Sequence, residues 1–417
     1  MTADGRKELP NGWMFVPLKS VARLIPGGTP DTDNELYWAD EGGESWVAIG
    51  DMSKTDLVAS TEKSVTPAGR LSARLSTGSI GTVLFAMYAS VGAVSTLGIE
   101  ASWNQALLGV DPIGDKSDSK FLAYSLISAR DELPYLYRSN TQNNLNASQV
   151  GALRICLPPL DEQRQIAEYL DRETGKIDEL IAKQEHLVAA LGERLTALWS
   201  NQIDELAQKY PTVSIRRVID SIVDGPFGSS LTSAHYSEDG ARVIRLGNIG
   251  IFVFKNFDQA YIPLDYAREL SAHAVSAGDV IVAGLGDEKM PLGRAAVVPD
   301  TLGIALVKAD CYRVRANNRV SSEYLAWALS SPQLREQFKL LSRGSTRQRL
   351  NTTVVRDPTI PLPPRAAQDA AVQRFSVENA QMDQVVLKAV QVVEMLRERR
   401  AALISAAVTG KIDVRGL

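Results

Sequence analysis

Two polar loops carry the side chains most suited to chemistry in this sequence. Residues 343–349 (Arg-Gly-Ser-Thr-Arg-Gln-Arg) combine three arginines with two hydroxyls and an amide, and residues 137–144 (Tyr-Arg-Ser-Asn-Thr-Gln-Asn-Asn) offer several amides and one arginine. Such side chains form hydrogen bonds with base edges in nucleic-acid grooves, and Lys and Arg also bind phosphates. Each loop precedes a Leu-Asn pair, so we expect the two loops to share a role; solvated polar loops without a ligand are the alternative.

A third polar group lies in residues 242–249, which parallel residues 45–52 and are expected to form a strand followed by a turn. An exposed strand face is the alternative explanation for the two arginines there. The complete set of residues that could read bases is Arg138, Asn140, Gln142, Asn143, Asn144, Arg242, Arg245, Asn248, Arg343, Ser345, Thr346, Arg347, Gln348 and Arg349. Candidates for phosphate contacts are Lys54, Lys63, Arg70, Arg74, Lys255, Lys289 and Arg294.

Motifs for other chemistry are missing or incomplete. The Gly-Lys pairs at 175–176 and 410–411 lack the other residues of a phosphate-binding P-loop. The segment Asp224-Gly-Pro-Phe227 resembles only superficially the Asn-Pro-Pro-Tyr motif, which holds an amino group for methylation. Two cysteines in strand-like runs form neither a disulfide framework nor a zinc set, and the three histidines are isolated. We therefore expect no catalytic residue and no metal site.

The elements that must position the polar loops occur twice. Residues 157–170 (Leu-Pro-Pro-Leu-Asp-Glu-Gln-Arg-Gln-Ile-Ala-Glu-Tyr-Leu) match residues 362–375 (Leu-Pro-Pro-Arg-Ala-Ala-Gln-Asp-Ala-Ala-Val-Gln-Arg-Phe), with Gln163 aligned to Gln368. Prolines disfavour helix before them, and the polar residues that follow favour a helix N-terminus. Each copy therefore marks the junction between a globular module and a long helix.

Apolar residues spaced by threes and fours predict the contact face of each long helix. These seam residues are Leu170, Ile177, Ile181, Val188, Leu191, Leu198, Phe375, Met382, Val386, Val393, Leu396 and Leu403. A lone helix cannot bury such a stripe, so the two helices are expected to pack on each other in antiparallel orientation. The expected fold class is α+β, with two mixed α/β domains alternating with the helices of an antiparallel coiled coil in a pseudo-twofold repeat. The expected boundaries are 1–158, 159–209, 210–363 and 364–417.

Composition indicates how large the cores can be and which surroundings suit the protein. With 417 residues and 45% apolar residues, the chain can build several cores. No segment approaches the run of about 18 apolar residues that a membrane span requires, so a cytoplasmic protein is expected. The net charge of −4 provides no general attraction to nucleic acid, so local basic loops would have to supply it.

Taken together, the duplication, the paired Leu-Pro-Pro junctions, the opening Pro26-Gly-Gly-Thr-Pro30 and the tail at 403–414 give a recognisable pattern. The chain resembles the specificity subunit of type I restriction-modification enzymes from end to end. The resemblance implies two target-recognition domains, each reading one half of a split double-stranded DNA sequence. It also implies that the paired helices set the gap between half-sites and dock two modification (methyltransferase) subunits.

The resemblance further implies a non-catalytic chain whose partners carry S-adenosylmethionine, ATP and Mg²⁺. Two restriction subunits, which are ATP-dependent translocases and nucleases, would be additional partners. Outer-face helix residues such as Arg164, Glu168, Arg172 and Asp178 are candidate contacts to the modification subunits, with a solvated helix face as the alternative. Two other functions remain open: a coiled-coil scaffold without DNA specificity, and an enzyme whose active site leaves no recognisable motif.

Overall fold

The structure is a computed structural model that describes residues 9–52, 55–136, 144–287, 290–342 and 349–415. The chain divides into two compact units. Unit 1 consists of Met1–Glu185 with Val390–Leu417, and unit 2 consists of His186–Ala389. Each unit therefore contains one globular domain together with a part of each long helix.

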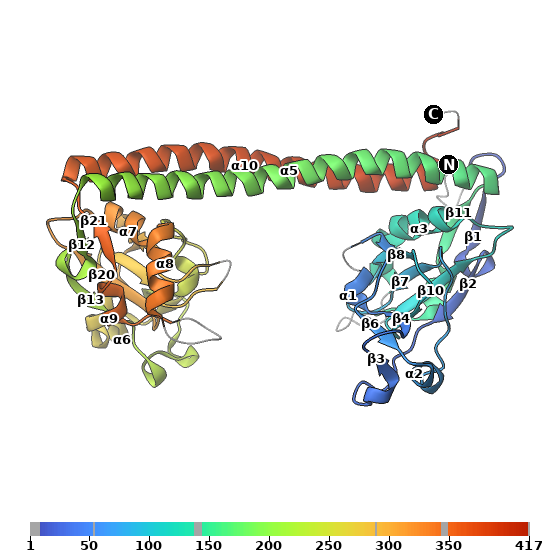
Figure 1. Ribbon diagram of the computed structural model, residues 1–417, viewed down its shortest axis with the longest axis horizontal. Helices are drawn as coiled ribbons and strands as arrows, with labels where there is room; N and C mark the ends of the chain where they lie inside the picture. The colour runs from blue at the N-terminus through green and yellow to red at the C-terminus, as the bar shows by residue number, and fades with distance from the viewer. Residues whose placement is uncertain (1–8, 53–54, 137–143, 288–289, 343–348, 416–417) are drawn as a thin grey trace. The chain divides into compact units, whose positions relative to one another are not determined.

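The long helices are α5 (Leu160–Lys209) and α10 (Arg365–Val408). Both begin directly after a Pro-Pro pair, as the sequence predicts; α5 has Asp161 and Glu162 in its first turn, whereas α10 has no acidic residue there. In unit 1, Glu185 of α5 pairs with Arg397 of α10 at 3.0 Å, and Asp178 pairs with Arg400 at 2.9 Å. One residue number falls as the other rises, so the helices are antiparallel (Figure 1).

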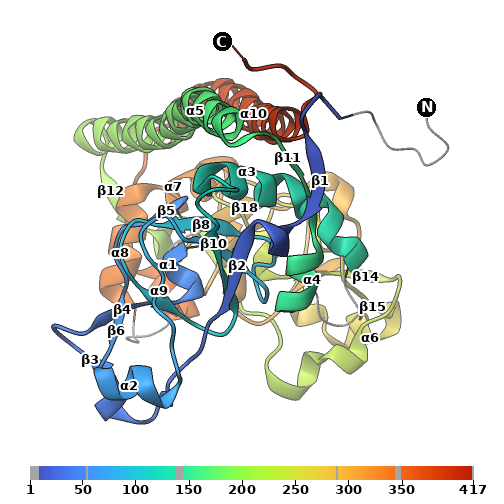
Figure 2. The same cartoon turned by 90° about the vertical axis from the view of Figure 1, so that its right-hand side faces the viewer.

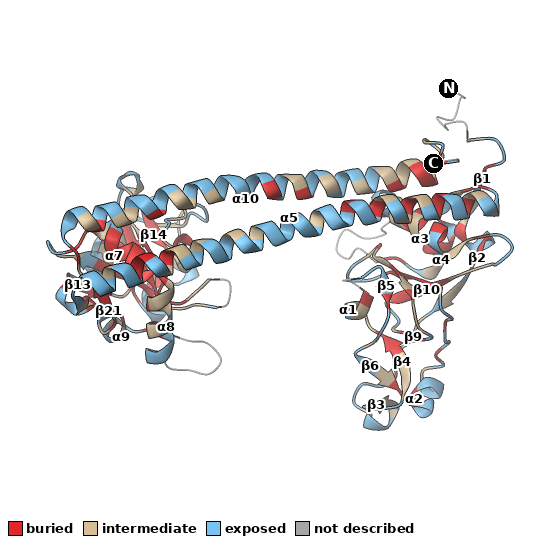
Figure 3. Ribbon diagram, turned by 45° about the horizontal axis from the view of Figure 1, so that its top comes forward, coloured by how far each residue is buried: buried red, intermediate tan, exposed pale blue. Residues whose placement is uncertain are grey.

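All twelve predicted seam residues are buried or half-buried. In unit 1, Leu170 belongs to one core cluster with Ile404, Ala407 and Val408. In unit 2, the Phe375 ring lies 4.3 Å from the Trp199 ring. The residues buried most deeply on the helices lie where the globular domains pack against them (Figure 3).

Unit 1 contains a two-stranded sheet β1-β11, a five-stranded sheet β2-β10-β7-β8-β5 and a four-stranded sheet β3-β6-β4-β9. The short sheet β1-β11 leads to the start of α5 (Figure 2). The strands are β1 (Met14–Pro17), β2 (Ala22–Pro26), β3 (Trp38–Ala39), β4 (Glu44–Val47), β5 (Leu57–Val58), β6 (Lys63–Val65), β7 (Val83–Ala86), β8 (Val94–Leu97), β9 (Ser102–Trp103), β10 (Leu107–Pro112) and β11 (Arg154–Leu157). The short helices are α1 (Ile49–Met52), α2 (Pro67–Ser72), α3 (Ser119–Ser128) and α4 (Ala147–Ala152).

Unit 2 contains a two-stranded sheet β12-β21 and the four-stranded sheets β13-β20-β17-β18 and β15-β14-β19-β16. Its strands are β12 (Thr212–Ser214), β13 (Ile219–Val223), β14 (Ala241–Ile244), β15 (Tyr261–Ile262), β16 (Ala274–Val275), β17 (Val280–Ala283), β18 (Ala295–Val297), β19 (Ala305–Val307), β20 (Cys311–Ala316) and β21 (Thr359–Pro361). Its short helices are α6 (Leu264–Glu269), α7 (Ser322–Leu329), α8 (Pro332–Leu341) and α9 (Thr352–Arg356).

The sheet orders show the same plan in both units. The order β2-β10-β7-β8 corresponds to β13-β20-β17-β18, and the parallel pair β4-β9 corresponds to β14-β19. Alternation of buried side chains does not define the central strands, because β7 and β17 are buried along their whole length. The predicted α+β class with an internal repeat and an antiparallel helix pair is confirmed.

A buried glutamine joins each domain to its long helix. The Gln163 side chain accepts a hydrogen bond from Asp118 N (2.9 Å) and donates to Lys116 O (3.0 Å) and Pro158 O (2.9 Å). In unit 2, Gln368 accepts from Ser321 N (2.9 Å) and donates to the carbonyls of residues 319 and 363, each at 2.9 Å. Both amides are fully buried, and Asp118 and Ser321 cap the equivalent helices α3 and α7. The repeated glutamine thus fixes the helix start to the domain.

Candidate nucleic-acid interface

The two polar loops are described only at their ends. Asn144 and Arg349 lie within the described residues. The remaining loop candidates fall outside them, and these are Arg138, Asn140, Gln142, Asn143, Arg343, Ser345, Thr346, Arg347 and Gln348.

The Leu-Asn pair after each loop has a structural task. Asn146 caps α4 by accepting a hydrogen bond from Gln149 N, and Asn351 caps α9 by accepting from Val354 N, both at 2.9 Å. The preceding leucines are buried, and their backbone amides bind equivalent carbonyls: Leu145 N to Met87 O at 3.0 Å and Leu350 N to Gly284 O at 2.8 Å. The residues that follow the two loops therefore occupy equivalent points of the two domains.

Three further segments meet the end of each polar loop. In unit 1, Gly28 N donates to Trp103 O, and Met87 N donates to Ala106 O. In unit 2, Gly284 N donates to Asp310 O, while a β carbon on Gly225 would lie only 2.0 Å from the Lys308 carbonyl carbon. We call these groups loop cluster 1 (27–30, 87–88, 104–106 and 144) and loop cluster 2 (224–227, 284–285, 308–310 and 349).

Loop cluster 2 holds a cation between an acid and an aromatic ring. Arg349 Nε lies 2.7 Å from Asp310 Oδ1, and the guanidinium carbon lies 5.4 Å from the centre of the Phe227 ring. Asp224 Oδ1 accepts a hydrogen bond from Asp310 N at 3.0 Å. Burial raises the pKa of Asp224 to about 6, against the hydrogen bonds from Gly225 N and Asp310 N that lower it. Phe227 is 48% exposed, so an apolar ring and a cation share this surface.

Loop cluster 1 presents amides and hydroxyls in the corresponding place. Thr29 Oγ1 and Gln105 Oε1 share a short hydrogen bond, and Gln105 and Tyr88 are exposed. Asn104 uses its Oδ1 atom to accept from Ala106 N at 3.0 Å, which fixes the turn before β10. Asn144 is half-buried and has an interaction partner. The two clusters therefore share a scaffold but differ in charge.

The third candidate group holds a turn together. Asn248 is fully buried; its Oδ1 accepts from Arg245 N at 2.9 Å, as Asp51 Oδ2 accepts from Ala48 N at 2.8 Å in unit 1. Arg242 is 2% exposed, lies over the Tyr261 ring, and has a lowered pKa because of its burial. An exposed strand face is thus wrong for Arg242, and neither Arg242 nor Asn248 has exposed surface for a base edge. The proposed interface does not include them.

Arg245 is the half-buried member of that group, and its charge is already paired. Its guanidinium forms a salt bridge with Asp258, and its Nη2 also donates to Asp258 O at 3.1 Å. About 30% of the side chain remains exposed.

Several phosphate candidates are also engaged within the domains. Arg294 is 3% exposed, and its guanidinium donates to five backbone carbonyls, from residues 246, 249, 285, 290 and 291. It therefore clamps loops from within, so its expected phosphate contact is corrected to a structural role. Arg70 pairs with Glu44 at 3.1 Å, and Lys255 lies over the Phe257 ring. Lys54 and Lys289 lie outside the described residues.

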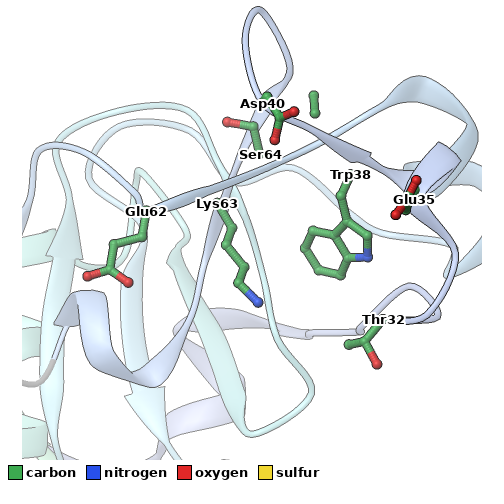
Figure 4. A pocket seen from close by; sticks show the side chains of 8 residues that line it. Thr32, Glu35, Trp38, Asp40, Glu62, Lys63 and Ser64 are labelled. Atoms are coloured by element: carbon green, nitrogen blue, oxygen red, sulfur yellow. The ribbon is translucent and has the colours of Figure 1, made fainter. Parts of the chain in front are cut away.

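A separate hollow on the sheet β3-β6-β4-β9 has the wrong charge for DNA. Its volume is about 560 Å³, and Figure 4 shows Lys63 beside the Trp38 ring, with Glu35, Asp40 and Glu62 around them. Three carboxylates against one lysine repel phosphate. Among the described residues, no three His, Cys, Asp or Glu side chains gather as a metal site would require. Nor does any helix in the described ranges have the length and apolar character needed to cross a membrane.

Two components of this surface were not predicted from the sequence. Phe227 belongs to a segment whose only sequence signal was its likeness to another motif, and Asp310 lies in a short turn with no signal of its own. Asp310 adopts a positive φ of 65°, a conformation that Asp tolerates better than most side chains. The sequence equivalence of the two loop ends was the only feature that could have pointed to Phe227 and Asp310.

Comparison with known proteins agrees with this architecture. The type I restriction modification DNA specificity domain family matches residues 10–188. The type I restriction enzyme MjaVIII specificity subunit of Methanocaldococcus jannaschii is 21% identical over 72% of this chain and 72% of its own length. The EcoKI specificity subunit of Escherichia coli strain K12 is 24% identical over 43% of this chain and 38% of its own.

Two solved structures have the same fold. One is a chain from work on complex assembly and conformational transition of the type I R-M system, with a TM-score of 0.73 and 16% identity over 98% of this chain and all of the other. The second is the HsdS subunit from Thermoanaerobacter tengcongensis, with a TM-score of 0.51 and 17% identity over 99% of this chain and all of the other. The duplicated domains, the helix pair and these relatives agree: residues 10–188 match the type I restriction modification DNA specificity domain, and the chain as a whole is similar to type I restriction-modification specificity subunits.

Proposed function

We propose that this chain reads a bipartite double-stranded DNA sequence, with one globular domain for each half-site, and that α5 and α10 dock two modification subunits. The observation that carries the proposal is the pair of loop clusters, which have equivalent backbone hydrogen bonds but different side chains. A repeated scaffold with divergent polar chemistry suits two readers of different base sequences, because base identity is read by side-chain donors and acceptors.

The charge pattern supports local rather than global attraction to DNA. The whole chain carries a net charge of −4, so steering by total charge is absent. Arg349 in loop cluster 2 and Gln105 in loop cluster 1 are exposed polar side chains. The residues of 138–143 and 343–348 remain proposed DNA contacts on the basis of their composition alone.

Exposed apolar residues on the long helices support docking. On the unit 1 part, Leu180, Val390 and Met395 are 47%, 43% and 60% exposed. On the unit 2 part, Val377 and Leu387 are 51% and 52% exposed. Apolar side chains in such positions favour a protein partner over water. We assign them to the modification subunits.

Catalysis belongs to the partners in this proposal. S-adenosylmethionine would be held by the modification subunits, and ATP with Mg²⁺ by two restriction subunits where these are present. The chain itself would supply sequence reading, half-site spacing and assembly. A coiled-coil scaffold without DNA specificity is the competing function.

Exchange of one domain tests the proposal. Residues 13–157 are replaced by the corresponding domain of another specificity subunit, and the methylated motif is determined in the presence of the modification subunit. We expect one half-site to change while the other half and the spacer stay the same. A change in both halves would contradict the one-domain, one-half assignment. In a second variant, deletion of two helical turns from both α5 and α10 should shorten the recognised spacer, and an unchanged spacer would contradict the role of the helices.

A further inference from the structure

The geometry of loop cluster 2 points to a guanine reader: we infer that Arg349 binds a guanine edge in the half-site of unit 2, and that Asp310 and Phe227 are its positioning residues. This inference rests on the proposed function, since it names the base that one part of the proposed interface selects. It goes further by assigning roles to two residues that are not themselves expected to identify the base.

The backbone around Arg349 is fixed on both sides. Arg349 forms an antiparallel β bridge with Leu285, and the next residue, Leu350, donates its N–H to Gly284 O at 2.8 Å. The Leu350 carbonyl accepts a hydrogen bond from the buried Tyr312 hydroxyl at 2.5 Å. The Arg349 side chain therefore starts from a defined point at the surface.

The guanidinium is then held in two further directions. Its Nε atom faces Asp310 Oδ1 at 2.7 Å, and its plane lies over the Phe227 ring, with 5.4 Å from the guanidinium carbon to the ring centre. An ion pair and a cation–π contact both restrict the rotamers of an otherwise flexible side chain. The Tyr312 hydroxyl is close enough for Arg349 to lower its pKa, against the larger rise caused by burial. Even so, 51% of the Arg349 side chain stays exposed.

This arrangement favours a base edge over a phosphate. Asp310 lies against the Nε side of the guanidinium, and the Tyr312 hydroxyl also interacts with it. The guanidinium still has further N–H donors for a ligand, and a pair of such donors matches O6 and N7 of guanine. Asp310 also neutralises much of the charge that would attract a phosphate. The exposed Phe227 ring gains nothing from a phosphate, but it loses contact with water when it enters a groove beside base edges.

Asp310 is itself held by the fold. Its backbone N–H donates to Asp224 Oδ1 at 3.0 Å, and its carbonyl accepts from Gly284 N at 2.7 Å. Its φ of 65° is unfavourable for most side chains, but Asn adopts such values readily. Asp310→Asn therefore removes the charge while preserving the turn, which makes it a cleaner test than Asp310→Ala.

The test uses the full chain assembled with its modification subunit. The methylated motif of the wild-type complex first identifies both half-sites. Binding is then measured on duplexes in which each unit 2 half-site position is varied, and on a duplex carrying 7-deazaguanine, which lacks the N7 acceptor, at each guanine. The variants are Arg349→Ala, Arg349→Lys, Asp310→Asn, Phe227→Leu and Phe227→Tyr. The controls are Arg216→Ala and Asp357→Asn, at two residues that form a surface salt bridge. Arg216 lies just before β13 and Asp357 just before β21, whereas Phe227 follows the other end of β13.

We expect the wild-type complex to lose roughly 5- to 150-fold in affinity when one specific guanine is changed, the discrimination typical of a bidentate arginine–guanine pair. Arg349→Ala should remove the preference at that position alone, and 7-deazaguanine should then cause no further loss. Asp310→Asn and Phe227→Leu should weaken the same preference, whereas Phe227→Tyr should retain it. No variant should change the base preferences in the first half-site. Both control variants should bind every duplex with the affinity of the wild type.

Three results would overturn the inference. If Arg349→Ala lowers the affinity equally for every sequence and reduces the slope of affinity against salt, the side chain contacts a phosphate. If the unit 2 half-site specifies no G·C pair, there is no guanine for it to read. If Asp310→Asn and Phe227→Leu leave the guanine preference intact, they are not positioning residues. A wild-type complex that shows no split motif at all would instead overturn the proposed function, so the two failures are distinguishable.

Discussion

Replacing the buried junction glutamine by methionine should loosen one domain from its helix. Gln163 satisfies three backbone groups, Asp118 N–H and the carbonyls of Lys116 and Pro158, and the residue is completely buried. Methionine has nearly the same volume and no amide, so Gln163→Met removes three hydrogen bonds without opening a cavity. Water cannot reach the three backbone groups that lose their partner, so each should cost about 1 kcal/mol or more of stability. The free energy of unfolding should therefore fall by about 3 kcal/mol.

For a unit of roughly 200 residues, a loss of about 3 kcal/mol corresponds to a fall in melting temperature of about 6–12 °C. Gln165→Met is the matched control, because Gln165 lies on the same helix and is exposed. The assay combines thermal unfolding with hydrogen exchange of the segment around Asp118. Faster exchange should appear there in Gln163→Met, and around Ser321 in the equivalent variant Gln368→Met.

Because the junction glutamine occurs twice, the prediction can be tested separately in each unit. Each substitution should perturb its own unit, because Gln163 and Gln368 contact different segments. If Gln163→Met and Gln165→Met have the same melting temperature, or if Asp118 exchanges no faster, the glutamine is not the joint between domain and helix.

Three other predictions concern single side chains. Arg294→Met should destabilise unit 2 by about 3 kcal/mol in chemical denaturation, because five carbonyls lose their buried donor; an exposed phosphate-binding arginine would give almost no change. The folded-state pKa of Asp224, about 6, exceeds its ordinary 3.8, so the folded protein binds this proton more tightly and wild-type stability should fall as pH rises through that window. Asp224→Asn should lack this component, and parallel stability curves against pH for the two proteins would contradict the assignment. Arg400→Leu breaks ion pairs with Asp178 and Asp56 whose carboxylates are 47% and 78% exposed, so the loss should be below about 1 kcal/mol and should disappear at high salt.

The architecture was predictable because the sequence patterns that determine it occur twice in the chain. Pro-Pro pairs locate the starts of α5 and α10, and apolar residues spaced by threes and fours locate their covered faces. The aligned Gln163 and Gln368 could be recognised as equivalent, but the three partners of each amide come from distant backbone segments that have no sequence signature.

The site was less predictable because polar residue types do not reveal burial. Asn248 and Arg294 look like surface residues, yet one holds a turn and the other clamps five carbonyls. Arg349 was identified as a candidate from its loop, whereas Phe227 and Asp310 gain meaning only when the fold brings residues 227, 310 and 349 together. Contacts between segments so far apart in the chain depend on the tertiary structure.

Methylation mapping tests the central claim most directly. DNA from cells that express this chain together with its modification subunit is compared with DNA from cells that express the modification subunit alone. We predict a new methylated motif, split into two halves by a fixed gap, that appears only when this chain is present. If both proteins are made and co-purify but no new motif appears, the chain acts as a scaffold without DNA specificity, which would contradict the proposed reading of DNA.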